Sequence, residues 1–262
     1  MKRLTAVLGR TVEDLPGFEF PQVKPLYLAF ARMVRNLEFD VCELALATCL
    51  QAVEAGVPIT LVPVELVGSG HHRSLTRLPD GPALTPEDLP GKRIGVRSYS
   101  QTTGLWVRGI LQEEYGIAAS DVTWVTTEEP HVAQYREPAY VTRSSAARVA
   151  DLLRDGEVEA AVLGPRAIGG QGEGLVPVIP GAEAAERAWA ERHGFSPINH
   201  LLVVRDEVLR AVPDQVRALA EKLGAGWTDE LRACLELAAR YALEQELLRE
   251  PIDLEKATRK WT

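Results

Sequence analysis

A polar loop near the middle of the chain has the composition of an anion-binding site. The segment LPGKRIGVRSYSQTTGLWVRGILQEE, residues 89–114, predicts a short strand at 94–96, a polar loop and then a helix. A strand that leads through a hydroxyl-rich loop into a helix N-terminus brings free backbone N–H groups together with the positive end of the helix dipole, and this combination binds carboxylates and phosphates. Ser and Thr also open helices simply as caps, so both interpretations stand at this point. The candidate ligand-binding residues of this segment are Tyr99, Ser100, Gln101, Thr102 and Trp106.

Two arginines that follow predicted strands are candidates for binding a carboxylate. Arg10 comes directly after the strand expected at 4–8, and the carboxyl ends of strands in an open α/β sheet face the ligand. The alternative for Arg10 is an exposed loop residue. Arg166 stands in the glycine-rich turn of GEVEAAVLGPRAIGG, residues 156–170, where glycines allow a ligand to approach closely. This turn lacks the Lys-Ser/Thr of a P-loop and the spacing of a dinucleotide fingerprint, so nucleotide binding is only weakly supported.

Two further residues are suited to moving a proton. His200 stands at the start of an apolar strand expected at 201–204, and an imidazole titrates near neutrality, which suits a general acid or base. The alternative is a buried histidine whose nitrogens are satisfied by neighbours. Glu43 stands at the junction of a buried strand, 39–42, and a helix. A carboxylate there either caps the helix N-terminus or faces the ligand, where it binds hydroxyl groups or transfers a proton.

The segment GSGHHRS, residues 68–74, adds His72 and Arg73 as candidates for facing the same ligand. Adjacent histidines point in different directions, so His71 and His72 make a poor metal-binding pair. No HxH, HExxH or CxxC motif accompanies them, and no metal is expected. His131 and His193 lie in polar surroundings and give no signal.

The composition is that of an ordinary globular protein that acts on small molecules. The 262 residues carry 29 Lys and Arg against 37 Asp and Glu, and the net charge of −8 argues against a nucleic-acid or anionic-membrane surface. No apolar run is long enough for a transmembrane helix, and the N-terminus lacks the apolar stretch of a secretory signal, so we expect a cytoplasmic protein. Cys42, Cys49 and Cys234 fit a reducing compartment, and Cys42 and Cys49, in apolar surroundings, are expected to be buried, inert thiols.

Strand and helix patterns alternate along most of the chain, which predicts an α/β fold with mainly parallel sheets. Two stretches, 78–90 and 195–199, are expected to cross between two lobes. Lobe 1 then comprises residues 1–92 and 198–262, with the C-terminal helices packed on it, and lobe 2 is an insertion of residues 93–197. A ligand is expected in an interlobe cleft. The strands are expected at 4–8, 39–42, 59–64, 94–96, 122–125, 160–163, 176–179 and 201–204, and the helices at 26–36, 45–55, 103–115, 146–154, 182–192 and 213–250, with a break at 224–226.

Several segments together resemble the 4,5-dihydroxyphthalate decarboxylase family. They are FDVCELALATCL, the GKRIGV to WVRGILQEEYGI block, DLLRDGEVEAAVLGPR and GFSPINHLLVVR, and they cover most of residues 1–210 in the family's order. The resemblance implies a two-lobed type II periplasmic-binding-protein-like fold and an intracellular protein that handles an aromatic carboxylate. Residues at matching motif positions are Arg10, Glu43, Tyr99, Thr102, Trp106, Arg108, Arg166 and His200.

The chain also departs from the family's pattern. Ser98 stands where an acidic residue is expected before the tyrosine, and His72-Arg73-Ser74 replaces the order Arg-His-Ser. The tail after about residue 210 has no specific match. These departures bear on the identity of the substrate rather than on the fold.

The resemblance leads to a hypothesis for the chemistry. In a para-hydroxylated aromatic acid, the ionised phenol pushes electrons toward the carbon that bears the carboxylate, and protonation of that carbon releases carbon dioxide, so no cofactor is required. Arg10, Arg166 and the loop amides near 100–102 would bind carboxylates, His200 would donate the proton with His72 in reserve, and Glu43 would bind or deprotonate ring hydroxyls.

Other functions are compatible with the same sequence. One is a solute-binding protein or sensor without chemistry, and another is a biosynthetic enzyme that acts on a different carboxylated or pyrimidine-like compound. The helical tail from Val208 onward, rich in Leu and Ala, suits either a homo-oligomer or intramolecular packing.

Overall fold

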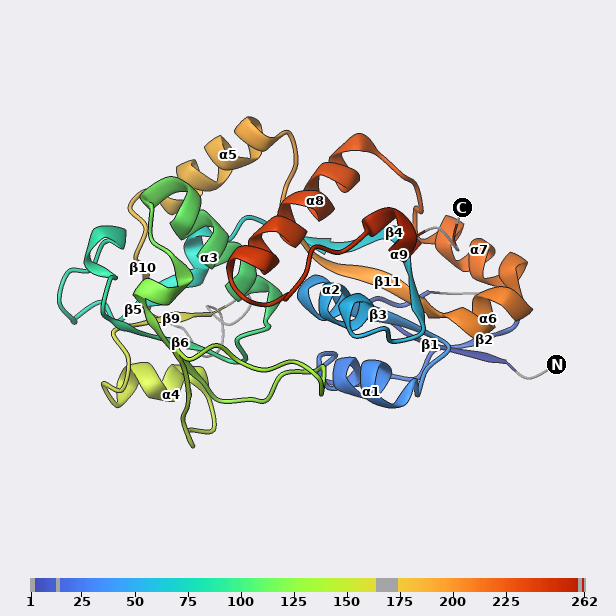
Figure 1. The fold of residues 1–262 in the computed structure, drawn as a ribbon, viewed down its shortest axis with the longest axis horizontal. Helices are drawn as coiled ribbons and strands as arrows, with labels where there is room; N and C mark the ends of the chain where they lie inside the picture. Colours follow the sequence, from blue (N-terminus) through green and yellow to red (C-terminus); the bar gives the residue numbers. More distant parts are fainter. Residues whose placement is uncertain (1–2, 13–14, 164–173, 259–260, 262) are drawn as a thin grey trace.

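The computed structural model describes residues 3–12, 15–163, 174–258 and 261, and it shows two α/β lobes side by side (Figure 1). The first lobe is built on a five-stranded sheet. Its strands, in spatial order, are β2 (Phe18–Glu19), β1 (Leu4–Val7), β3 (Val41–Ala45), β11 (Ile198–Arg205) and β4 (Ile59–Gly68). The second lobe is built on a six-stranded sheet in the order β10 (Val176–Pro177), β5 (Leu75–Arg77), β9 (Ala160–Val162), β6 (Arg93–Val96), β7 (Thr123–Thr126) and β8 (Val141–Arg143).

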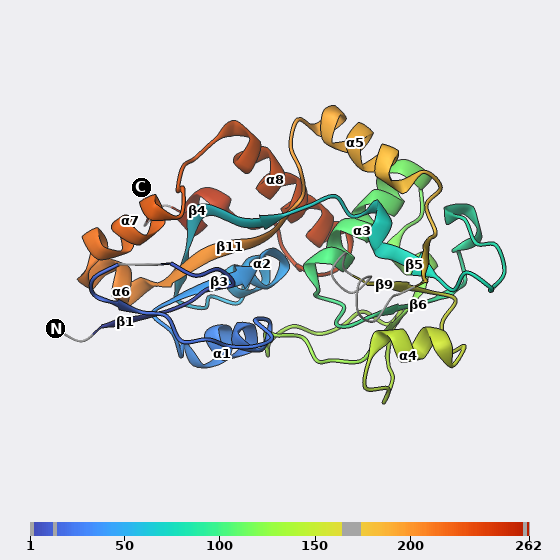
Figure 2. The same cartoon turned by 180° about the vertical axis from the view of Figure 1, so that it is seen from behind.

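Helices surround both sheets, and one of them lies where the lobes meet (Figure 2). The helices of the first lobe are α1 (Leu28–Asn36), α2 (Leu46–Glu54), α6 (Asp206–Ala211), α7 (Pro213–Lys222) and α9 (Leu254–Thr258). The second lobe carries α3 (Thr102–Tyr115), α4 (Val149–Arg154) and α5 (Ala182–His193). Helix α8 (Asp229–Glu244) packs on both α3 and α2 and so contacts both lobes, whereas the C-terminal helices had been expected on the first lobe alone.

Strand pairing in both sheets is mixed, which corrects the expectation of mainly parallel sheets. The pairs β1–β3, β6–β7 and β6–β9 are parallel, as strand–helix alternation predicts. Strand β11 runs antiparallel to β3 and β4, and β5 runs antiparallel to β9 and β10. The antiparallel strands flank the two crossings, because a chain that leaves one sheet and returns to it later enters in the reverse direction.

The chain first leaves the five-stranded sheet after β4, earlier than the proline-rich stretch 78–90 suggested. Strand β5 already belongs to the second sheet, whereas the expected boundary at residue 92 had left it in the first lobe. The return lies between α5 and β11. The two crossing segments contact each other, since the Ser69 N–H donates to the Pro197 carbonyl over 3.0 Å.

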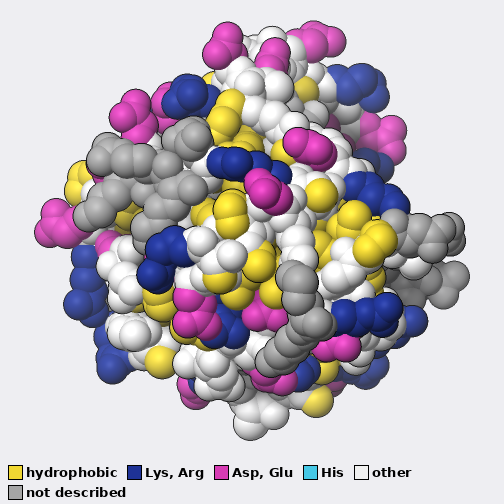
Figure 3. All heavy atoms as spheres, turned by 90° about the vertical axis from the view of Figure 1, so that its right-hand side faces the viewer, with side chains coloured by type: hydrophobic (Ala, Val, Ile, Leu, Met, Phe, Trp, Pro, Cys, Tyr) yellow, Lys and Arg dark blue, Asp and Glu magenta, His cyan; other side chains and the backbone are white. Residues whose placement is uncertain are grey.

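The end of the molecule where α6 and α7 lie carries intermingled acidic and basic side chains, with apolar groups between them (Figure 3). This mixture of charges is typical of a solvated surface rather than of a basic patch for nucleic acid. Each helix in the described part of the chain is either too short or too polar to cross a lipid bilayer.

Aromatic side chains join α8 to the second lobe. The Trp106 ring packs edge-on against Trp189 and Tyr241, with ring centroids 6.1 and 5.9 Å apart, and its Nε1 donates to the Ile198 carbonyl over 2.9 Å. Gly109 makes this approach feasible, because a Cβ there would lie 2.0 and 2.2 Å from Cδ2 and Cε2 of Tyr241.

Gly109→Ala is therefore expected to destabilise the protein by about 1–3 kcal/mol, since a rigid buried ring must move to admit one methyl group. Alanine's better helix propensity, worth up to about 1 kcal/mol, would not offset this overlap. Urea unfolding followed by circular dichroism measures the change. Gly226→Ala is the control, because a Cβ there meets no atom within 4 Å, and its effect should stay within about 0.5 kcal/mol. Equal effects of the two variants would contradict the packing argument.

The first crossing holds a fully buried histidine, His71, whose Nε2 lies 2.7 Å from Asn199 Oδ1 at the start of β11. Burial lowers the pKa of His71 to about 4, although the hydrogen bond to Asn199 acts in the opposite direction. Above that pH the imidazole is neutral in the folded protein.

Stability should consequently fall as the pH drops from about 6.5 to about 4, because the unfolded chain binds a proton on His71 that the folded chain cannot. The contribution of this residue to the slope is about 1.4 kcal/mol per pH unit at most. His71→Gln keeps a hydrogen-bonding group near Asn199 but cannot titrate. Its free energy of unfolding, measured by urea titration at several pH values, should depend less steeply on pH in that window, and an unchanged slope would refute the assignment.

Candidate functional site

A buried carboxylate joins the ends of three neighbouring strands in the first lobe. Glu43 lies in β3, and its side chain is 2% exposed. Oε1 lies 2.6 Å from Nδ1 of His200 on β11, and Oε2 accepts the N–H of Gly9, just beyond β1, over 2.7 Å. Both carboxylate oxygens are thus engaged by the protein itself.

The surroundings of Glu43 favour its ionised form. Burial by itself would raise the pKa of this carboxyl group, but the hydrogen bonds from His200 and from the Gly9 N–H, with the charges of His200 and Arg10, outweigh burial and lower it. A buried carboxylate held in this way is stable only while its hydrogen-bond partners stay in place.

The alternative of helix capping by Glu43 is wrong. The residue preceding α2 is Ala45, and no side chain of its own segment caps the helix there. Glu43 lies two residues earlier, within the strand, and its oxygens bind Gly9 and His200 instead.

His200 has the geometry of an oriented and accessible imidazole. Its side chain is 25% exposed, which differs from the alternative of a fully buried histidine. Nδ1 is fixed by Glu43, and the Phe30 ring packs edge-on against the imidazole with centroids 5.3 Å apart. No hydrogen bond joins Nε2 to the described part of the chain. A carboxylate at Nδ1 orients the ring, and Nε2 is left able to exchange a proton with a ligand.

Of the two arginines expected to bind carboxylate, the structure describes Arg10 alone. Arg10 is exposed, and one guanidinium nitrogen donates to the Leu66 carbonyl over 3.0 Å. Its charge acts on Glu43, so it lies near the Glu43–His200 pair. Arg166 falls in 164–173, outside the described residues, and its role stays a prediction.

The polar loop before α3 contacts the first lobe. Thr102 Oγ1 accepts the Ala47 N–H over 3.0 Å and thereby satisfies a free N–H group in the first turn of α2. The hydroxyl groups of Ser98 and Ser100 are buried and lie 3.1 Å apart. Gln101 precedes α3 without capping it through its side chain. The loop therefore lies where the lobes meet, and its part in binding an anion stays a prediction.

Three residues at motif positions lie in the core of the second lobe rather than beside His200. The Tyr99 hydroxyl donates to the Gln245 carbonyl over 2.9 Å, and the Arg108 guanidinium lies over the Tyr99 ring, 3.9 Å from its centroid. Trp106 is buried against the rings that join α3 to α8. These side chains have almost no exposed surface to offer a ligand, and their contacts are packing and hydrogen bonds within the protein.

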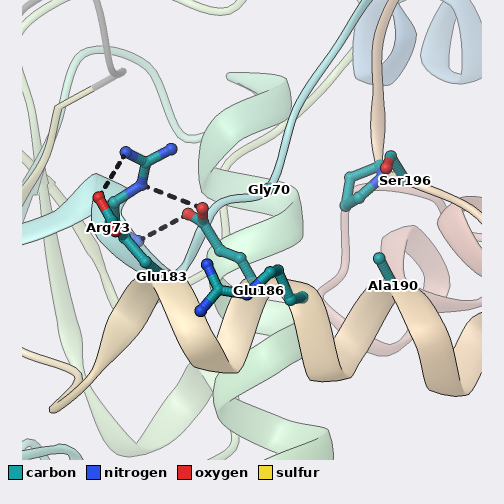
Figure 4. A pocket seen from close by; sticks show the side chains of 8 residues that line it. Gly70, Arg73, Glu183, Glu186, Ala190 and Ser196 are labelled. Atoms are coloured by element: carbon teal, nitrogen blue, oxygen red, sulfur yellow. Dashed lines mark hydrogen bonds and ion pairs between the residues drawn. The ribbon is translucent and has the colours of Figure 1, made fainter.

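Arg73 lies on the side of the first crossing that faces α5 (Figure 4). His72 is buried, with Nε2 3.0 Å from Glu114 Oε2. Nε of Arg73 donates to Glu186 over 3.0 Å, and its guanidinium also contacts Glu183 at 3.3 Å. Arg73 lines a surface pocket of about 410 Å³ with both of these acids. Among the described residues, no hydrogen bond or ion pair joins either His72 or Arg73 to His200 or Glu43.

One residue near the site gave no signal in the sequence. Nδ1 of His131 lies 2.8 Å from Thr48 Oγ1, and the Phe30 ring that contacts His200 also packs edge-on against His131, with centroids 5.6 Å apart. His131 is separated from Thr48 by 83 residues, so no local spacing could have revealed the contact.

Within the described ranges, no three His, Cys, Asp or Glu side chains are grouped as metal ligands. All three cysteines are buried, and burial raises the pKa of each thiol, that of Cys234 to about 12. Such thiols are protonated and poor nucleophiles near neutral pH.

Comparison with known proteins gives relatives of one kind. No family model matches the chain. The chain is 36% identical over 198 residues to 4,5-dihydroxyphthalate decarboxylase of Comamonas testosteroni. The aligned region covers 70% of this chain and 59% of that protein. It is also 36% identical over 147 residues to the protein of that name from Pseudomonas putida, covering 53% and 57%. The chain thus spans less than two thirds of the length of these curated relatives.

Solved structures agree with the predicted fold. The periplasmic aliphatic sulphonate binding protein SsuA of Escherichia coli is 12% identical, with a TM-score of 0.65 over 98% of this chain and 97% of that one. The desulfurization enzyme DSZB is 16% identical, with a TM-score of 0.60 over 98% and 96%. The chain therefore has the two-lobed periplasmic-binding-protein-like α/β fold, and its resemblance to the 4,5-dihydroxyphthalate decarboxylases is confirmed.

Proposed function

We propose that this protein is a decarboxylase of a hydroxylated aromatic carboxylate such as 4,5-dihydroxyphthalate. The observation that carries the proposal is the Glu43–His200 pair, a buried carboxylate 2.6 Å from one nitrogen of a partly exposed imidazole. The names of the relatives at 36% identity support the reaction and the substrate class.

The chemistry follows from the orientation of His200. With Nδ1 held by Glu43, Nε2 donates a proton to the ring carbon that bears the carboxylate, while the para-hydroxyl group supplies electrons to the ring. The bond between that carbon and the carboxylate then breaks, carbon dioxide leaves, and the electron pair restores the aromatic ring. The added proton stays on the ring, and solvent returns a proton to His200. Arg10 binds a substrate carboxylate near the pair.

A second candidate function is a solute-binding protein or sensor. The similarity to the sulphonate-binding protein, which extends over 98% of this chain, favours it. The two functions give different results when the purified protein is incubated with hydroxylated phthalates and benzoates. Release of carbon dioxide supports the decarboxylase, whereas ligand-dependent thermal stabilisation without gas supports the binding protein.

His200→Ala is expected to lower the rate of carbon dioxide release by about 10²–10⁴-fold, because the proton donor is lost. His193→Ala is the matched control, since His193 lies on α5 next to Glu113 and should not affect turnover. Retention of near-normal turnover by His200→Ala would refute the role assigned to this histidine.

Glu43→Gln tests the positioning role of the carboxylate. The amide is of equal size but carries no charge to stabilise the imidazolium, so kcat should fall by at least about 10²-fold while KM changes little. Glu38→Gln removes an exposed carboxylate paired with Arg32 and should leave both constants unchanged. Steady-state kinetics with carbon dioxide detection measures them. A rise in KM with kcat preserved would mean that Glu43 contributes to binding instead.

A further inference from the structure

The residue that the sequence suggested for binding the substrate's ring hydroxyls is already engaged within the protein. Glu43 was the candidate, but its Oε1 faces His200 and its Oε2 accepts the Gly9 N–H. A buried carboxylate with both oxygens engaged has no free surface for a substrate hydroxyl. The proposed substrate therefore calls for another polar group beside His200.

His131 is placed to do so from the second lobe. The Phe30 ring packs edge-on against both histidines, with centroids 5.6 Å from His131 and 5.3 Å from His200. Each imidazole has its Nδ1 held by a side chain of the first lobe, Thr48 for His131 and Glu43 for His200. Nε2 of His131 has no hydrogen bond within the described part of the chain. This nitrogen is not completely buried. Both imidazoles therefore contact one aromatic ring, and neither Nε2 has a partner in the described part of the chain; His131 is 7% exposed and His200 25%.

The backbone that carries His131 is held firmly. Nε of Arg35 on α1 donates to the His131 carbonyl over 2.7 Å, and a second nitrogen of Arg35 donates to the Pro130 carbonyl over 2.6 Å. Upstream, the Arg97 carbonyl accepts the N–H groups of Thr127 and Glu128. A side chain fixed by such supporting contacts is suited to recognising one atom of a ligand.

The imidazole of His131 is neutral at physiological pH. Burial, together with the positive charges of Arg97 and Arg35, lowers its pKa to about 4. A neutral imidazole offers one donor and one acceptor, and a ring hydroxyl can pair with either. It adds no charge that would compete with Arg10 for a carboxylate.

We propose that His131 determines specificity by a hydrogen bond from its Nε2 position to a ring hydroxyl of the aromatic carboxylate. This inference rests on the proposed substrate class. It assigns the second lobe a direct part in selecting hydroxylated rings, while the first lobe supplies the proton donor.

The test compares the binding of 4,5-dihydroxyphthalate with that of phthalate, which lacks both hydroxyls. Calorimetry is done with His200→Ala protein, so that the ligand is not consumed. His131→Asn carries its amide near the position of Nδ1 and can keep the contact with Thr48, but it has nothing at the position of Nε2. The preference for 4,5-dihydroxyphthalate over phthalate should fall by about three- to tenfold, the range for one hydrogen bond, with the affinity for phthalate unchanged.

Two further variants separate recognition from structure. His131→Gln reaches the position of Nε2 and should restore part of the preference. Thr48→Val removes the contact at Nδ1 and should lower the preference less than His131→Asn does. Equal weakening of both ligands by His131→Asn would show a purely structural role, and an unchanged preference would overturn the proposal.

The outcome is distinguishable from failure of the proposed function. If the unmodified protein releases no carbon dioxide but the preference depends on His131 as expected, decarboxylation is refuted and the recognition of the hydroxyl stands. If the protein binds neither ligand, the role of His131 is overturned together with the substrate class.

Discussion

The buried charge of Glu43 is the constraint on which the site depends. A carboxylate removed from water must be compensated by hydrogen bonds and positive charge, and here the compensation comes from Gly9, His200 and Arg10. Gly9 and Arg10 lie just beyond β1 and His200 lies on β11, so satisfying the one charge of Glu43 on β3 fixes the relative positions of three neighbouring strands. Gly9 has to be small for the same reason, because a Cβ there would lie 3.1 and 3.3 Å from the two carboxylate oxygens.

The first turn of α2 fixes the position of the second lobe relative to the first through two hydrogen bonds. Its Ala47 N–H is satisfied by Thr102, and its Thr48 hydroxyl contacts His131, and both partners belong to the second lobe. A helix end that lacks a cap from its own segment is completed by the other half of the molecule. One of these contacts, that of Thr48 with His131, lies beside the Phe30 ring, which also packs against His200.

The sequence predicted the longer strands well, because buried apolar runs such as those of β3 and β11 precede helical patterns. It could not predict β2, β5 or β8, which are two or three residues long and form only because a neighbouring strand is present. Glu43 and His200 were recognisable by residue type and position. Tyr99 and Arg108 were not recognisable as core residues, since their partner Gln245 is 146 and 137 residues away in the chain. His131 was missed for the same physical reason.

The Glu43–His200 pair has a different value for a protein that only binds an anion than for an enzyme that transfers a proton. A protein that only binds an anion gains nothing from a buried carboxylate, which weakens the local positive field and costs free energy to desolvate. Such a carboxylate is useful where the orientation and protonation of its partner imidazole matter, as they do when a proton is delivered to one carbon atom. Arg10 stays exposed beside the pair and can still attract a carboxylate. The arrangement of Glu43 behind His200 is therefore the feature that distinguishes the proposed decarboxylase from a solute-binding protein.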